Sequence, residues 1–88
     1  MTRVKKAVKG PAKSKKHVSD LTKLGDRIKS LRLAQGYTNY ENFAFEHDIP
    51  RAQFGRYERG EDLRYSSLLK VISAFGMTQK EFFSEGFD

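Results

Sequence analysis

The sequence predicts an all-α fold, a compact domain of five short helices over residues 20–88 behind a basic arm of residues 1–19. Apolar side chains recur at three- and four-residue steps through most of residues 20–88. Glycine, proline or a capping sequence separates each of these segments from the next. The length of 88 residues allows one domain at most.

The arm differs from the rest of the chain in charge. Residues 1–19 contain seven Lys or Arg and no acid, whereas residues 20–88 contain ten Lys or Arg against eleven Asp or Glu, a balance of −1. The net charge of +6 therefore belongs to the arm. Its low-complexity composition predicts disorder in the free protein. Two roles remain open for it: contact with DNA phosphates or a minor groove, and a solvated tail that aids solubility.

The first predicted helix spans residues 20–35, with Ser19 or Asp20 as its cap and Gly36 after its end. Its buried stripe consists of apolar residues at helical spacing, namely Leu21, Leu24, Ile28 and Leu31. Three basic residues fall mostly outside this stripe: Lys23, Arg27 and Lys29.

The second predicted helix spans residues 39–47, where Thr38 and Glu41 fit a capping box and Asn39 is a rival cap. A tight turn follows. Asp48 tolerates a left-handed backbone there, and Pro50 suits the start of the next helix, residues 51–59.

The helix over residues 51–59 has two unlike faces. Phe54 and Tyr57 lie three residues apart on one face, which predicts packing on a small core together with Phe43 and Ala44 of the preceding helix. The other face carries side chains suited to base edges in the major groove of DNA, namely Arg51, Gln53, Arg56 and Arg59.

This stretch resembles the lambda-repressor-like (Cro-type, xenobiotic-response-element-like) helix-turn-helix family of bacterial and phage regulators. The resemblance covers roughly residues 24–83. The matching features are Gly36-Tyr37-Thr38 before the first helix of the motif, the pair Phe43-Ala44, Ile49 in the turn, Phe54 and Tyr57, and the closing Glu58-Arg59-Gly60.

The resemblance implies a set of base-edge contacts, which map to Arg51, Ala52, Gln53, Gly55 and Arg56. Arg56 or Arg51 is expected to pair with guanine, and Gln53 with adenine. Gly55 either lets the backbone approach DNA closely or leaves room for a thymine methyl. The alternative for Gly55 is a weak point in the helix, and for the arginines an ordinary solvated face.

The resemblance also implies contacts at the edges of the motif. Asn39 and Tyr40 belong to the expected DNA-binding set, and Tyr40 stands where the family usually has a phosphate-binding Gln. Arg59 and Arg64 are expected to meet phosphate. Glu58 is expected to pair with Arg32 on the first helix.

Two further helices complete the prediction. Residues 65–75 form the fourth helix, which stops at Gly76, and Thr78 with Glu81 forms a capping box that opens the fifth. The inner face of the fourth helix is predicted to carry Leu68, Leu69, Ile72 and Phe75, and the fifth to place Phe82 and Phe83 on its core side. The seven phenylalanines are predicted to be mostly core: Phe43, Phe45, Phe54, Phe75, Phe82, Phe83 and Phe87.

Several classes of function are not expected. The chain has no cysteine, its two histidines are far apart in sequence, and it contains no phosphate-binding loop, so we expect no enzyme activity, metal, cofactor or small-molecule ligand. No apolar run approaches the roughly 20 residues of a membrane span. The cytoplasm, at the nucleoid, is the expected location.

The predicted function is a sequence-specific transcription regulator of double-stranded DNA, acting as a repressor. The family usually binds as a twofold dimer, and Phe83 and Phe87 are predicted to contribute to a dimer surface. The alternative is a protein-interaction module or antitoxin on the same fold, with weak or non-specific DNA binding. The charge of −1 in residues 20–88 and the atypical Tyr40 and Pro50 favour that alternative.

Overall fold

The computed structural model describes residues 19–88, and within this range it contains five α-helices and no strand. The helices are α1 (Asp20–Ala34), α2 (Tyr40–Glu46), α3 (Arg51–Glu58), α4 (Tyr65–Ala74) and α5 (Gln79–Phe82). The prediction of an all-α, five-helix domain is confirmed. The predicted disorder of the arm lies outside the described residues, except at Ser19.

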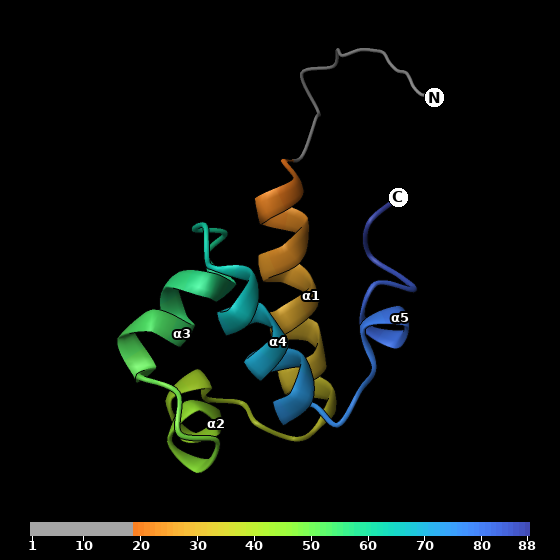
Figure 1. The fold of residues 1–88 in the computed structure, drawn as a ribbon. Coiled ribbons are helices and arrows are strands. Elements are labelled where there is room, and N and C mark those ends of the chain that lie inside the picture. Colours follow the sequence, from red (N-terminus) through yellow and green to blue (C-terminus); the bar gives the residue numbers. More distant parts are fainter. Residues whose placement is uncertain (1–18) are drawn as a thin grey trace.

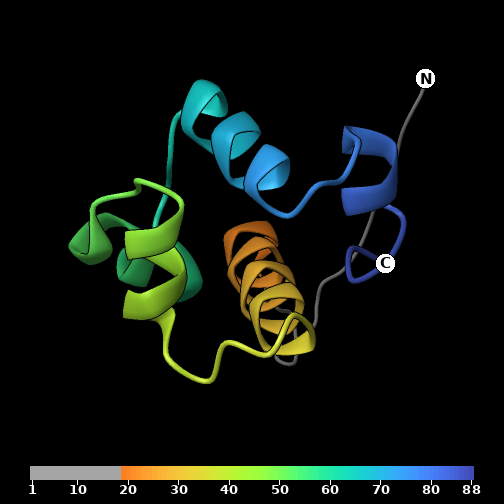
Figure 2. The ribbon, with the colours of Figure 1, turned by 90° about the horizontal axis from the view of Figure 1, so that it is seen from below.

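The helices are arranged around α1 (Figure 1). Figure 2, viewed at right angles, also places α2 and α3 on one side of α1 and α5 on the other. α1 packs against α3 and α2, α2 packs against α3, and α4 contacts α5. The face formed by α3 is therefore separated from the C-terminal segment by the width of the domain.

α1 is capped by Ser19, whose side-chain oxygen accepts the Thr22 N–H at 3.1 Å. The helix ends at Ala34, one residue earlier than predicted. Burial of Leu21 was a wrong prediction, because its side chain is 37% exposed. The backbone at Gly60 lies against the backbone of Leu21 and Thr22 in this first turn.

The core is centred on Phe43, which is fully buried. Its ring lies 5.1 Å from that of Phe54 and 4.9 Å from that of Phe75, measured between centroids. The two helices of the motif, α2 and α3, and the end of α4 thus meet at one aromatic cluster. The buried apolar residues are Ile28, Phe43, Ala44, Ile49, Phe54, Tyr57, Leu68, Val71, Ile72, Phe75 and Phe82.

α2 is capped by Asn39 and not by Thr38. The Asn39 Oδ1 accepts the Glu41 N–H at 2.6 Å, so the predicted capping box of Thr38 with Glu41 does not form. An Asn cap accepts the N–H two positions on, which places the helix start one residue later than a Thr38 cap would.

α4 and α5 follow the prediction except at two positions. Val71, and not Leu69, is fully buried on α4, whereas Leu69 is only partly covered. The capping box of Thr78 and Glu81 is present and opens α5. Phe82 is buried, but Phe83 is 42% exposed, because α5 is a single turn and adjacent residues point in different directions.

Arg27 joins α1 to α5. Its Nε donates to the carbonyl of Phe82 at 2.8 Å, and its Nη2 donates to the carbonyl of Glu81 at 3.1 Å. These carbonyls lie at the C-terminal end of α5, where the helix itself offers few partners, and that of Glu81 also accepts the Ser84 N–H at 3.2 Å. The prediction that Arg27 lies mostly outside the buried stripe was therefore wrong, because this residue is only 8% exposed.

Candidate nucleic-acid interface

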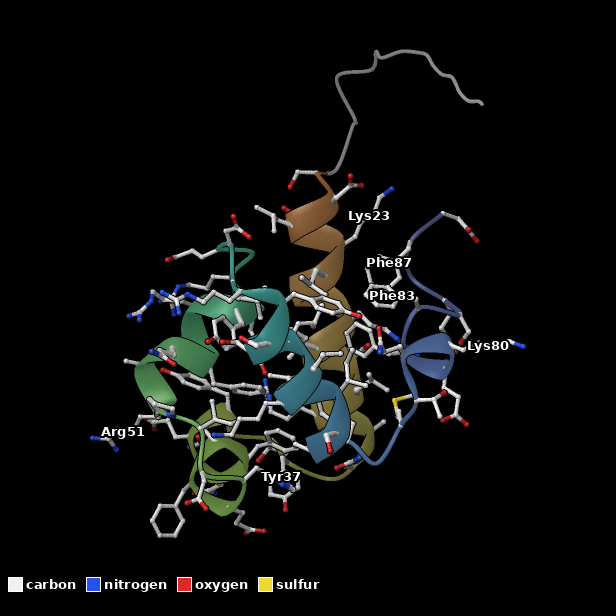
Figure 3. The ribbon with its side chains drawn as sticks, viewed as in Figure 1. Lys23, Tyr37, Arg51, Lys80, Phe83 and Phe87 are labelled. Atoms are coloured by element: carbon white, nitrogen blue, oxygen red, sulfur yellow. The ribbon has the colours of Figure 1, made fainter. Side chains whose placement is uncertain are left out.

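α3 turns one face inward and the other outward. Phe54 and Tyr57 are buried, whereas Arg51, Gln53 and Arg56 are exposed. Ala52 is exposed on the same outward face. Figure 3 shows Arg51 extending away from the domain at the start of α3. The predicted division of the helix into a core face and a polar face is confirmed.

The turn before α3 sets the direction of this helix. Asp48 has a φ of 57°, the left-handed conformation that its sequence position predicted. Ile49 is buried, and its N–H donates to the carbonyl of Ala44 at 2.9 Å. Pro50 occupies the N-cap position without a side-chain hydrogen bond. α3 therefore begins at Arg51, as expected, with the N–H groups of its first turn lacking a side-chain cap.

An ion pair fixes the other end of α3 to α1. Arg32 Nε donates to Glu58 Oε2 at 2.7 Å and Arg32 Nη2 donates to Glu58 Oε1 at 3.1 Å, while both side chains are more than nine-tenths buried. Arg32 Nη1 also donates to the carbonyl of Tyr37 at 2.6 Å. The expected pairing of Glu58 with Arg32 is confirmed, and it ties α3 to the segment that leads into α2.

Gly25 is a position that the sequence analysis missed. A Cβ atom built there would lie 2.7 Å from the backbone oxygen of Glu58 and 2.8 Å from that of Tyr57. α1 and the end of α3 approach each other too closely for any side chain at this point. A glycine inside an otherwise good helix was the available signal, because such a residue weakens a helix unless close packing requires it.

Gly55 faces inward, beneath the ring of Tyr40. It is buried, and a Cβ atom there would lie 2.9 Å from Tyr40 Cε1. This corrects the expected groove-facing orientation of Gly55, since the missing side chain makes room for a tyrosine ring and not for a base. Tyr40 is thereby held at the start of α2, beside Asn39.

The exposed arginines lie beside carboxylates of the same chain. Arg51 lies 3.9 Å from Glu41, and Glu61 lies 3.8 Å from Arg56 and 4.0 Å from Arg59. All of these side chains are substantially exposed, so each guanidinium remains accessible to a larger partner.

A polar hollow of about 470 Å³ connects α3 to the start of α4. Gln53 and Arg56 line it from α3, and Arg64 and Ser67 from the start of α4. Arg64 is the N-cap residue of α4 and makes no side-chain capping hydrogen bond. A helix start next to two arginine side chains suits anionic oxygens, and the carboxylate of Asp62 also lines the hollow and offsets part of this positive charge.

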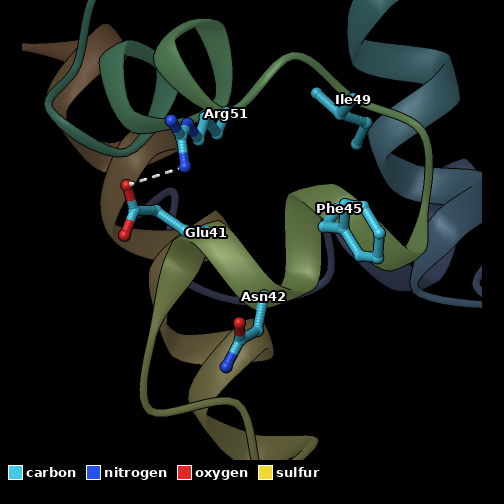
Figure 4. Close-up of a pocket in the computed structure, with 5 residues that line it drawn as sticks. All are labelled: Glu41, Asn42, Phe45, Ile49 and Arg51. Atoms are coloured by element: carbon cyan, nitrogen blue, oxygen red, sulfur yellow. Dashed lines mark ion pairs between the residues drawn. The ribbon is translucent and has the colours of Figure 1, made fainter.

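A second hollow, of about 420 Å³, lies between α2 and the start of α3 (Figure 4). Glu41 and Arg51 face each other at one end, and Phe45 and Ile49 line the other. Burial of Phe45 was predicted wrongly, since this side chain is 83% exposed. It lies two residues after Phe43, which on a short helix is close to the opposite face.

Tyr37 holds the segment before α2 against the C-terminal end of that helix. Its O–H donates to Glu46 Oε1 at 2.6 Å, and its ring meets Phe43 edge-on with centroids 5.2 Å apart. The hydrogen bond to Glu46 raises the pKa of the Tyr37 hydroxyl, with further contributions from partial burial and from the negative charge of Glu46.

Among residues 19–88, no group of three or more His, Asp or Glu side chains is placed to hold a metal ion. None of the helices in this range is both long and apolar enough to cross a bilayer. The organised polar surface of the described residues is the outward face of α3 with its flanking arginines.

Two short helices crossing at a tight turn, with a polar outer face on the second, define a helix-turn-helix unit. The chain is similar to the restriction-modification controller protein C.AhdI from Aeromonas hydrophila, with 34% identity over 73% of this chain and 97% of that one and a TM-score of 0.65. It is also similar to the restriction-modification controller protein C.Esp1396I, with 25% identity over 77% of this chain and 88% of that one and a TM-score of 0.66.

The chain belongs to the Cro/C1-type helix-turn-helix family of DNA-binding transcription regulators, and it is not an enzyme. No family model matches the sequence, and no curated protein matches it.

Proposed function

We propose that this protein is a sequence-specific regulator that reads the major groove of double-stranded DNA with the outward face of α3 and represses transcription. The observation that carries the proposal is the arrangement of α3, whose inner face is locked to α1 and α2 while Arg51, Ala52, Gln53 and Arg56 stay exposed. A rigid support of this kind lets a few side chains reach base edges at fixed positions.

The flanking residues are proposed to position the protein on the DNA backbone. Arg59 is the C-cap residue of α3, and Arg64, at the start of α4, lines the hollow together with Gln53 and Arg56. Tyr40 and Asn39 lie at the start of α2, where a hydroxyl and an amide can reach phosphate. Such contacts supply affinity without sequence information.

The similar structures extend this proposal to a biological role. C.AhdI and C.Esp1396I are restriction-modification controller proteins. We propose that the present chain likewise controls transcription of the genes of a restriction-modification system. It would act in the cytoplasm, at the nucleoid.

A homodimer is part of the proposal. Phe83 is 42% exposed, and its ring lies 4.9 Å from that of the partly buried Phe87. Figure 3 places the two rings together between α1 and α5, away from Arg51. A twofold contact through this aromatic pair would leave α3 of each protomer free to enter one half-site.

The test is selection of the full-length protein against a random duplex DNA library at moderate salt. We expect a palindromic motif with half-sites about one helical turn apart. The matched control is the variant R51A/Q53A/R56A, which keeps the buried face of α3 and is expected to enrich no motif. Salt-sensitive binding without a motif would contradict the proposal and would assign binding to the lysine-rich arm.

A second function is favoured by one observation, the 83% exposure of Phe45 beside the hollow between α2 and α3. An aromatic ring exposed to this degree is typical of protein contact surfaces. Absence of any DNA binding in the selection would favour a protein-interaction module on this fold.

A further inference from the structure

Each arginine on the outward side of α3 already has a carboxylate neighbour in the free protein. The carboxylate of Glu61, in the loop after α3, lies between two of them, with Oε1 3.8 Å from Arg56 Nε and Oε2 4.0 Å from Arg59 Nη2. At the other end of the helix, Glu41 lies 3.9 Å from Arg51 (Figure 4). The surface proposed to meet DNA therefore contains acids in contact with its own cations.

The fold does not depend on the Glu61 carboxylate. The side chain is about half exposed, and both separations are long for an ion pair. Exposed pairs of this kind shift an equilibrium by up to about five-fold. The position of the loop is set instead by its backbone, since the Glu61 N–H donates to the carbonyl of Arg56 at 3.1 Å.

The carboxylate has different effects on two modes of DNA binding. Binding to arbitrary DNA depends on phosphate contacts, with which Glu61 competes for Arg56 and Arg59 and which it also repels. A bidentate pair between arginine and guanine discriminates by about five- to 150-fold, which exceeds the strength of an exposed ion pair. A matching guanine can therefore draw Arg56 away from Glu61, whereas a non-matching base edge offers no contact strong enough to replace the ion pair.

We infer that Glu61 is a specificity-determining residue, which restrains Arg56 until a matching base edge is present. The inference rests on the proposed function of α3. The charge of −1 in residues 20–88 agrees with it, because this part of the chain lacks the excess of positive charge that would attract any DNA. Glu61 thus acts mainly by weakening complexes with DNA that lacks the matching base.

The experiment compares the full-length protein with its Glu61→Gln variant, which removes the charge and keeps the size of the side chain. The matched control is Glu85→Gln, since Glu85 is also exposed and paired with an arginine at 3.9 Å, but lies in the C-terminal segment. Dissociation constants are measured by fluorescence anisotropy over a range of KCl concentrations. The two probes are a duplex enriched in the library selection and the same duplex with its sequence scrambled.

Glu61→Gln is expected to tighten binding of the scrambled duplex by about three- to ten-fold and to steepen its salt dependence by about one unit of log–log slope. Binding of the enriched duplex should change less than about two-fold. The dissociation constant for the scrambled duplex divided by that for the enriched duplex therefore falls. Glu85→Gln should leave that ratio unchanged. Equal effects of Glu61→Gln on both duplexes, or none, would overturn the inference. A wild-type protein that binds both duplexes equally would instead contradict the proposed function.

Discussion

Arg32 and Glu58 form a bidentate ion pair that joins α1 to the end of α3 with both side chains almost fully buried. The remaining guanidinium nitrogen of Arg32, Nη1, donates a third hydrogen bond to the carbonyl of Tyr37. The pair thus links the helix that is proposed to read DNA to the centre of the domain. Removing either partner would leave the other charge buried without compensation.

Substitution of either partner should therefore lower the free energy of unfolding. We expect Arg32→Ala and Glu58→Ala each to cost about 3–5 kcal/mol, and the double variant to cost much less than the sum. Urea unfolding followed by circular dichroism measures all three. Losses below about 1 kcal/mol for both single variants would show the pair to be as weak as an exposed one.

The two interior glycines of the helices should respond unequally to alanine. In Gly25→Ala the new methyl group meets the backbone oxygens of α3, which can move only if the helices separate. We expect a loss of at least about 1–3 kcal/mol, opposite in sign to the roughly 1 kcal/mol gain at an ordinary helix position. In Gly55→Ala the neighbour is the Tyr40 ring, which can rotate, so the loss should be smaller. Thermal unfolding of the two variants compares them directly, and a stabilised Gly25→Ala would refute the close contact.

The hydrogen bond between Tyr37 and Glu46 should be visible in a titration. The pKa of the folded Tyr37 lies above the ordinary value of 10.0. The protonated hydroxyl therefore contributes fully to stability at pH values below the pKa of Tyr37 in the unfolded chain. This contribution is lost as the pH rises through the higher pKa of Tyr37 in the folded protein. Glu46→Gln should move the pKa down toward 10.0. NMR of the tyrosine ring carbons, with Tyr37→Phe for assignment, measures the midpoint. An unchanged midpoint in Glu46→Gln would exclude this cause.

The aromatic pair at the C-terminus should determine self-association. Phe83→Gln is expected to weaken a dimer by about ten-fold or more, because a twofold contact loses the apolar area of two rings. Phe45→Gln is the matched control, since its ring is also exposed but lies beside α3. Light scattering over a concentration series measures both. A wild-type protein that stays monomeric at the highest concentration would rule out the dimer.

Local patterns predicted much of the fold. The spacing of Phe43, Ala44, Phe54 and Tyr57 predicted the core face of the motif, and Thr78 with Glu81 predicted the start of α5. These features depend on neighbours within a few residues. The family resemblance supplied the pair of Arg32 and Glu58, which no local pattern contains.

Features that depend on distant segments escaped the sequence analysis. The buried Arg27 satisfies carbonyls more than 50 residues away, and the need for glycine at position 25 comes from a crossing with α3. Phe45 was assigned to the core together with the other phenylalanines on the grounds of periodicity, but it lies near the opposite face of α2 from Phe43 and is 83% exposed. The carboxylate of Glu61 could not be placed beside Arg56 without the geometry of the loop.

The most direct test of the account is a base-by-base specificity profile of Arg56→Ala beside that of the wild type, obtained by parallel selection from one duplex library. Lys80→Ala is the control, because it removes one positive charge on α5, across α1 from α3. We expect the preference for one base pair in each half-site to fall by about five- to 150-fold in Arg56→Ala, while the preferences at the other base pairs are kept. An Arg56→Ala profile identical to that of the wild type would contradict the assignment of α3 as the reading helix.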